Sequence, residues 1–236
     1  MISIFFKNRK NIYEMKIRKK IIKIAIDSPA AAGAGTLAKT ISKHYNLLYL
    51  DTGKIYRMIA FIKIKQRQNF NLKFLRKKIK NLNLKSLQNN KLLSDEVGTE
   101  ASLIAKDKNI RKLVHSFQIN CAYRPPKKYK GSCLDGRDIT YKIIPDADFK
   151  FFVTASLKVR AKRRFKELKK FKKKISYMTV LKSIKIRDKN DYNRLISPLK
   201  KTKDSVLINT SNLSKRACFL KIKKIIDRKL KVNGNI

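Results

Sequence analysis

Residues 21–57 constrain the fold more than any other part of this 236-residue chain. Residues 21–27 (IIKIAID) form an apolar, β-branched run that stops at a Ser-Pro pair, which predicts a buried strand. Residues 35–45 carry apolar side chains at helical spacing, and residues 47–50 (LLYL) predict a second short strand. A strand, a glycine-bearing loop, a helix and a second strand form the opening of a parallel α/β sheet.

Later segments continue this alternation. Three more strands are predicted over residues 132–135, 148–155 and 205–210. Helices are predicted from near Lys54 onward and over residues 95–122, 157–173, 176–190 and 214–231. Residues 63–92 are rich in lysine and asparagine, and we expect them to form a small peripheral lobe.

The first 20 residues are expected to be a basic N-terminal extension. Lysines interrupt their short apolar patch and no small-residue cleavage site follows, so we do not predict a signal peptide. No apolar run approaches the roughly 20 residues that span a bilayer, and no membrane association is expected. Three cysteines and two histidines, none in a paired motif, argue against a disulfide framework or a zinc site and fit a reducing, cytoplasmic location.

The net charge of +44 favours polyanionic partners such as nucleic acid, anionic membranes or nucleotide phosphates. A second explanation is compositional drift, because lysine, isoleucine and asparagine are abundant along the whole chain. We favour drift for most of the lysines. Nonspecific electrostatic binding of nucleic acid is then expected, and specific binding is not.

The loop after the first strand partly matches the phosphate-binding pattern G-x-x-x-x-G-K-[ST]. Its residues are Ser28, Pro29, Ala30, Ala31, Ala32, Gly33, Ala34, Gly35 and Thr36. Ser28 stands in place of the first glycine, and Ala34 in place of the lysine that reaches the β- and γ-phosphates. Taken alone, the loop is better explained as a small-residue turn between a strand and a helix.

Polar clusters follow two of the other predicted strands, where open α/β sheets bind ligands. Residues 51–53 (DTG) offer a hydroxyl and a close backbone approach, and Arg57 on the next helix can pair with a phosphate. In residues 135–138 (DGRD), Asp135 occupies a position suited to the shell of a magnesium ion. Alternatively, the first cluster is a helix N-cap turn and the second a turn with an internal ion pair.

Four segments in order resemble the bacterial cytidylate kinases, a branch of the P-loop nucleoside monophosphate kinases. The resemblance covers about residues 21–226, with least support in 63–92. Its four segments are IDSPAAAGAGTLAK, LDTGKIYR at 50–57, LDGRDITYKIIPDADFKFFVTAS at 134–156, and IKIRDKNDYNR…SPL at 184–199. Four matches in family order are far more specific than any one of them.

The resemblance implies a three-layer α/β fold of the P-loop NTPase type with a mostly parallel sheet. It implies a single kinase domain over residues 21–236, with an inserted lobe at about 63–95 on the monophosphate side and a helical lid at about 157–200. The implied reaction is transfer of the γ-phosphoryl group of ATP to CMP or dCMP with Mg²⁺, by a cytoplasmic monomer.

The resemblance also assigns roles to individual residues. The loop residues 28–36 are expected at the ATP phosphates, and the metal site at Thr36 and Asp135. The CMP site is expected at Thr52, Gly53, Arg57, Ser102, Arg137 and Asp138. The catalytic charges of the lid are expected at Arg163, Arg187, Asp191 and Arg194, because phosphoryl transfer needs positive charge around the migrating group. A basic helical hairpin facing solvent is the alternative for the lid.

Several residues depart from the family pattern. Ala34 removes the loop lysine, and Ile119 follows Gln118 where the family has an arginine that binds the monophosphate. Asn190 and Tyr192 stand at lid positions that are often basic. Two alternatives to an active kinase therefore stay open: an impaired homologue that only binds nucleotide, and a basic nucleic-acid-binding protein on a kinase scaffold. An Ala34→Lys variant tests the first alternative. Its activity rises by orders of magnitude if the rest of the site is intact, and does not change if the site is impaired elsewhere.

Overall fold

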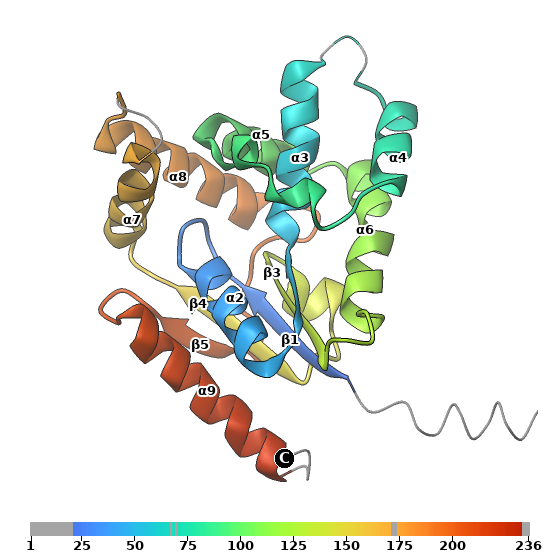
Figure 1. Cartoon of the computed structure of the whole chain (residues 1–236). Helices are drawn as coiled ribbons and strands as arrows, with labels where there is room; N and C mark the ends of the chain where they lie inside the picture. The colour runs from blue at the N-terminus through green and yellow to red at the C-terminus, as the bar shows by residue number, and fades with distance from the viewer. Residues whose placement is uncertain (1–20, 67, 69, 171–173, 233–236) are drawn as a thin grey trace, which may run out of the picture.

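The computed structural model describes residues 21–232 apart from residues 67, 69 and 171–173. The predicted N-terminal extension lies outside these described residues. A five-stranded, all-parallel sheet with the order β2-β3-β1-β4-β5 forms the middle of the molecule (Figure 1). Its strands are β1 (Ile22–Asp27), β2 (Leu48–Asp51), β3 (Gly131–Gly136), β4 (Phe149–Thr154) and β5 (Val206–Asn209). The predicted parallel α/β sheet is confirmed, and each strand end lies within one residue of its predicted position.

Helices cover both faces of the sheet, so the predicted three-layer arrangement is confirmed (Figure 1). The helices are α2 (Ala34–Tyr45), α3 (Thr52–Lys65), α4 (Leu72–Lys80), α5 (Asp95–Ile104), α6 (Lys108–Tyr123), α7 (Leu157–Lys169), α8 (Tyr177–Asn193) and α9 (Lys215–Val232). Short 3₁₀ turns form η2 (Ser86–Gln88) and η3 (Asn90–Leu93), and a single π-helical turn forms η4 (Ile139–Ile143).

The alternation of side chains along the strands explains the two cores. Ala25 of β1 faces the layer of α3 and α6, while its neighbours Ile24 and Ile26 face α2 and α9. All three side chains are fully buried. Because both faces of a parallel sheet are covered, the strand reads as a continuous apolar run. This explains why the sequence signal of β1 is so clear.

The segment predicted as one helix over residues 95–122 is two helices, α5 and α6. The break falls at Asp107, whose side chain accepts hydrogen bonds from the backbone amides of Asn109 (2.7 Å) and Ile110 (3.0 Å). These bonds satisfy amides at the start of a new helix, so a capping aspartate outweighs the helical periodicity on either side. Asp107 was a readable signal that the sequence analysis missed.

Helices α7 and α8 form a separate hairpin beside the sheet. A third apolar cluster, built on Ala161, Leu168, Val180 and Ile184, holds the two helices together. The helix α7 ends at Lys169, before the predicted limit, and α8 continues past its predicted limit to Asn193. The extension of α8 matters for the site, since it places Asp191 on a helix.

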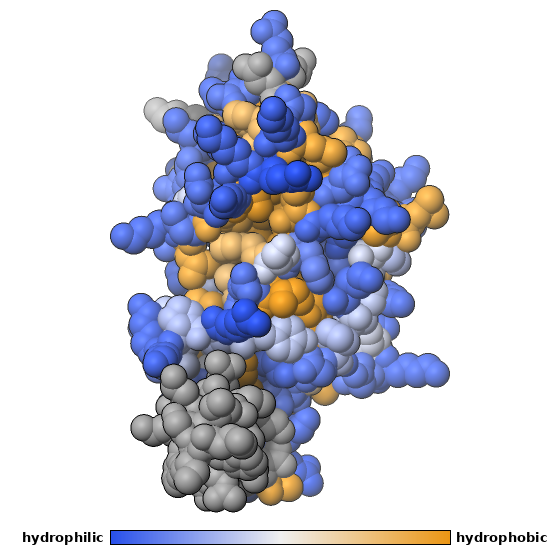
Figure 2. Space-filling view, turned by 90° about the vertical axis from the view of Figure 1, so that its right-hand side faces the viewer, coloured by the Kyte–Doolittle hydropathy of each residue, from blue (hydrophilic) through white to orange (hydrophobic). Residues whose placement is uncertain are grey.

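The surface is as hydrophilic as the charge predicts. In the face shown in Figure 2, hydrophilic residues project over most of the surface and surround a narrower apolar region. Within the described residues, no helix is both long and apolar enough to cross a bilayer. The three cysteines are free thiols, and Cys133 and Cys218 are buried.

Candidate active site

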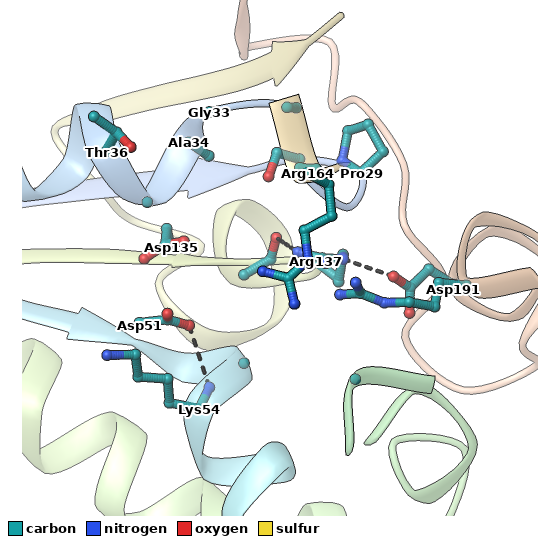
Figure 3. A pocket seen from close by; sticks show the side chains of 18 of the residues that line it. Pro29, Gly33, Ala34, Thr36, Asp51, Lys54, Asp135, Arg137, Arg164 and Asp191 are labelled. Atoms are coloured by element: carbon teal, nitrogen blue, oxygen red, sulfur yellow. Dashed lines mark hydrogen bonds and ion pairs between the residues drawn. The ribbon is translucent and has the colours of Figure 1, made fainter. Parts of the chain in front are cut away.

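One cavity of about 780 Å³ lies at the carboxyl ends of the strands. The loop after β1 forms one wall, the start of α3 and part of α5 form another, and α7 and α8 close a third (Figure 3). Because β1 lies between β3 and β4, the chain leaves this strand at the point where the order of the sheet reverses. Open α/β sheets bind ligands at such a point.

The loop after β1 turns through two residues in the left-handed region. Ala31 has φ of 60° and Gly33 has φ of 94°. Ser28, which stands in place of a glycine, does not have a positive φ, and its amide donates to Gly136 O (3.1 Å). The loop therefore keeps its turn without a glycine at residue 28, and Ala31 carries the backbone strain instead.

Arg163 of α7 lies against this loop. Its guanidinium donates to Oγ1 (2.8 Å) and to the carbonyl oxygen (2.6 Å) of Thr210, and the Thr210 hydroxyl donates to Ala32 O (2.9 Å). A Cβ atom added at Gly33 would lie 3.8 Å from Arg163 Nη1. A positive charge is thus held beside the backbone amides at the start of α2, where an anion is already favoured.

Two carboxylates face the loop from neighbouring strands. Asp51 and Asp135 are register partners in the β2–β3 pair, and an added Cβ at Gly35 would lie 3.6 Å from Asp135 Oδ2. Burial and the nearby charge of Asp51 raise the pKa of Asp135 well above its usual value. Asp135 Oδ1 is buried without a hydrogen-bond partner. An unpaired buried oxygen beside a second carboxylate is suited to a cation.

Asp27 at the end of β1 is fully buried and holds the start of η4 in place. Its carboxylate accepts from the amides of Ile139 (2.8 Å) and Thr140 (2.9 Å) and from the Thr140 hydroxyl (2.6 Å). Burial raises the pKa of Asp27 to about 6. These bonds fix the π-helical turn η4 directly after Asp138 and so fix the direction in which residues 137 and 138 enter the cavity.

Arg137 and Asp191 join the sheet to α8. The Nε atom of Arg137 donates to Asp191 Oδ2 (2.7 Å), and Arg194 Nη1 lies 3.8 Å from Asp191 Oδ1 (Figure 3). Arg187, one helical turn before Asp191, is also buried, and its Nε atom has no hydrogen-bond partner. Burial, together with the charge of Arg137, lowers the pKa of Arg187 to about 10. In this part of the cavity the arginines outnumber the carboxylates, so the local charge is positive.

Asp138 contacts a residue that the sequence analysis missed. Its carboxylate forms a short ion pair with Arg111 of α6, and Arg194 Nη2 lies 4.0 Å from Asp138 Oδ1. The Arg111 guanidinium also lies over the ring of Tyr56, 5.6 Å from its centroid. The Asp138 carboxylate lies between these two arginines and holds both side chains in place.

Arg57 and Ser102 line the wall formed by α3 and α5. Arg57 Nη1 donates to the carbonyl oxygens of Leu92 (2.6 Å) and Ser94 (3.0 Å). Burial, together with the charges of Arg187 and Arg164, lowers the pKa of Arg57 to about 9. The Ser102 hydroxyl donates to Thr99 O (2.7 Å) and accepts from Asn190 Nδ2 of α8 (3.0 Å).

Two buried arginines of α7 tie the hairpin to the rest of the molecule. Arg160 forms a two-bond ion pair with Asp188 (3.0 and 2.6 Å) and donates to Ala30 O in the loop (3.1 Å). Arg164 donates to Asp95 Oδ1 at the start of α5 (3.0 Å) and to Leu93 O. The hairpin therefore contacts both the loop and the α5 wall.

The structure brings almost all of the predicted site residues into this one cavity. The exception is Ala30, which is buried and contributes only its carbonyl oxygen, to Arg160. The expectation that residue 119 faces the monophosphate is corrected. The Ile119 side chain packs against the α3–α6 core and is not among the cavity residues. Arg111, about two turns earlier on the same helix, is the arginine that α6 supplies there.

The sheet order, the loop at the reversal point and the arginine-lined cavity place this chain among the P-loop nucleotide-binding proteins. The family model described as cytidylate kinase matches residues 24–228. The chain belongs to the cytidylate kinase family, which confirms the resemblance seen in its four motifs.

Individual relatives agree over nearly their whole length. The chain is 38% identical to a cytidylate kinase of Clostridium botulinum over 218 residues, which cover 88% of this chain and 98% of the relative. It is 39% identical to a cytidylate kinase of Bartonella bacilliformis, over 89% of this chain and 97% of the relative. The relative from Mesomycoplasma hyopneumoniae is 36% identical, over 89% and 96%.

A solved structure supports the fold independently. The crystal structure of an uncharacterized protein from Eubacterium ventriosum superposes with a TM-score of 0.52, covering 88% of this chain and 99% of that one. The sequence identity is 18%, so this likeness concerns the fold alone.

Proposed function

We propose that this protein transfers the γ-phosphoryl group of ATP to CMP or dCMP, giving ADP and CDP or dCDP. The observation that carries the proposal is the single cavity in which the loop after β1 faces the arginines of α3, α8 and the β3–η4 turn. Catalysis of phosphoryl transfer depends mainly on positioning and positive charge, with little covalent chemistry for the protein to do. The cytidylate kinase relatives support the choice of acceptor.

In this proposal the two substrates bind at opposite walls of the cavity. The loop residues 28–36 bind the ATP phosphates, and Thr52, Gly53, Arg57, Ser102, Arg137 and Asp138 hold the acceptor. A phosphate oxygen of CMP attacks the γ-phosphorus, the bond from this phosphorus to the β-phosphate oxygen breaks, and ADP leaves. Arg163, Arg187 and Arg194 supply charge to the migrating group, and Asp191 orients Arg137 and Arg194.

The oxygen atoms of Thr36 and Asp135 fit a magnesium ion. Asp135 offers an unpaired buried oxygen, and hydroxyl and carboxylate oxygens are the ligands that Mg²⁺ prefers. An ion held by these oxygens would neutralise negative charge on the phosphates of ATP. Asp51, the register partner of Asp135, adds to the negative field that attracts the cation.

We also propose that residues 157–200 act as a lid and residues 63–95 as a lobe on the acceptor side. The hydrogen bonds of Arg160 to the loop and of Arg164 to the start of α5 are the contacts a closed lid needs. Closure excludes water, so ATP is not simply hydrolysed. A cytoplasmic location, a monomeric state and the lack of a specific nucleic-acid partner stay predictions.

Ala34 favours one second candidate, a homologue that binds nucleotide but transfers phosphate poorly. Ile119 gives this candidate less support than Ala34, since the Ile119 side chain packs against the α3–α6 core. A coupled ADP-release assay with ATP, Mg²⁺ and each nucleoside monophosphate in turn separates the two. Turnover with CMP or dCMP above the other acceptors supports the kinase. No turnover by protein shown to be folded overturns it and favours the second candidate.

A further inference from the structure

The loop after β1 lacks a positive side chain at the position where P-loops carry lysine. Ala34 is 3% exposed and its methyl group packs among Ala32, Leu37 and their apolar neighbours. A lysine here normally reaches the β- and γ-phosphates. The cavity must take this charge from elsewhere if it binds a nucleoside triphosphate productively.

Most of the arginines in the cavity are already bonded to the protein. Hydrogen bonds or ion pairs hold Arg57, Arg111, Arg137, Arg163, Arg164 and Arg194. Arg187 is free, but it lies on α8, and its pKa is lowered in part by the charges of Arg137 and Arg164. The proposed function already assigns Arg187 to the migrating phosphoryl group, together with the neighbouring charges of α8 and the β3–η4 turn.

Four lysines line the cavity among the described residues: Lys54, Lys166, Lys170 and Lys215. The last three are exposed at the rim, and only Lys54 is half-buried. The structure records no hydrogen bond or ion pair for the Lys54 ammonium group. Its backbone amide donates to Asp51 Oδ1 (3.2 Å), which places the residue beside the carboxylates that face the loop (Figure 3).

The location of Lys54 is unfavourable for the helix that carries it. Asp51 is the N-cap of α3, so Lys54 lies in the first turn, which itself contains no acidic residue. The amides of a first turn carry a partial positive charge, and an ammonium group there repels them. An acidic side chain is the usual choice at this position. When an anion lies in front of the helix, both the first-turn amides and the Lys54 ammonium group interact with it favourably.

We propose that Lys54 supplies, from the wall opposite the loop, the phosphate-binding cation that Ala34 does not. This inference rests on the proposed function and specifies how that site works. The ammonium group of Lys54 reaches the β- and γ-phosphate oxygens of ATP on its flexible four-carbon stem. It neutralises the charge that builds up as the bond between the γ-phosphorus and the bridging oxygen breaks.

Lys54→Met tests the inference, because methionine keeps an unbranched side chain and removes the charge. We expect kcat/KM for ATP to fall by about 10²-fold, as when one donor to developing charge is removed. Lys39→Met is the matched control, since Lys39 is exposed on α2 outside the cavity. We expect its effect to stay within about two-fold. Loss of activity in Lys215→Met instead of Lys54→Met overturns the inference.

A double-mutant cycle with Ala34→Lys sharpens the test. If the two positions share one task, Ala34→Lys restores activity in the Lys54→Met background. The same substitution in the wild-type protein raises activity by a factor at least about ten-fold smaller, because the two effects are not additive. Additive effects overturn the inference. Lys54→Arg keeps the charge and retains more activity than Lys54→Met, which separates charge from folding.

Binding of ADP and AMP, measured by calorimetry, separates this inference from the proposed function. Lys54→Met is expected to weaken ADP by about ten-fold and to leave AMP unchanged, because only ADP has a β-phosphate; a ten-fold loss equals 1.4 kcal/mol. If the wild-type protein shows no turnover, the proposed function fails and this binding difference still decides the role of Lys54. Equal ADP affinity of the variant and the wild-type protein overturns the inference.

Discussion

Arg137 Nε donates to Asp191 Oδ2 across 2.7 Å and thereby joins the turn after β3 to helix α8, 54 residues further along the chain. Both side chains are largely buried, and Asp191 also faces Arg194 at 3.8 Å. A single carboxylate therefore sets the direction of two arginines that enter the cavity from different elements. The proposed lid and the acceptor side of the site meet at this contact.

Asp191→Asn is expected to lower kcat by about 10²-fold, because misplaced arginines no longer match the charge of the transition state. The amide keeps the shape of the side chain but has no charge with which to hold two guanidinium groups. The ADP-release assay with CMP gives kcat, and thermal unfolding checks the fold. Lys189→Gln, at an exposed neighbouring position on α8, is the control. Unchanged kcat in Asp191→Asn would show that Asp191 is not a positioning residue.

The elements of the sheet were predictable because both faces of each inner strand are buried. Ile24, Ala25 and Ile26 point to alternate faces, yet all three contact apolar helices, so the strand appears as an unbroken apolar run. The order of the strands was not predictable from the same signal, since periodicity says nothing about which strands pair. The α5–α6 break was predictable in principle from Asp107.

The site was predictable where a motif carried it and not where a single charged residue did. The loop, Arg137 and Asp138 lie in matched segments of sequence. Arg111 lies outside the matched segments and Lys54 lies in one without an assigned role, and neither stands out in a chain with 60 lysines and arginines, because composition alone cannot tell a buried cation from an exposed one. Their place in the cavity comes from α6 and from the first turn of α3, and so from tertiary packing.

Ala31→Gly is expected to stabilise the protein. Ala31 has φ of 60°, a region that costs an L-residue roughly 1 kcal/mol more than glycine. Glycine loses more conformational entropy on folding, which reduces the gain to about 0.5 kcal/mol. Urea unfolding measures it. Ala32→Gly, at a buried position whose φ is not positive, is the control and is expected to destabilise. Destabilisation in both variants would contradict the strain assigned to Ala31.

Asp27 is expected to make stability depend on pH. Its pKa is raised from 3.8 to about 6 by burial, so between these values the folded state binds more protons than the unfolded state. The contribution of Asp27 is therefore fully present below about pH 4 and is lost as pH rises through 6, a change on the order of 3 kcal/mol. Urea unfolding of the wild-type protein and of Asp27→Asn at pH 4.5 and pH 7 gives the difference between them. The same difference at both values would show that Asp27 has an ordinary pKa.

Asn190→Ala is expected to weaken the acceptor without unfolding the protein. Asn190 donates to Ser102 Oγ (3.0 Å) and accepts from Lys106 Nζ (2.9 Å), so it links α8 to the serine proposed to lie near the acceptor. Losing one such hydrogen bond costs about 1 kcal/mol, which corresponds to roughly a five-fold rise in KM for CMP. The KM for ATP stays unchanged, because Asn190 is not among the residues that line the cavity near the loop.

Initial rates with CMP and ATP varied in turn measure both constants, and Lys185→Ala, exposed on the same helix, is the control. Equal rises in both KM values would indicate a general loosening of α8, whereas a rise for CMP alone places Asn190 on the acceptor side.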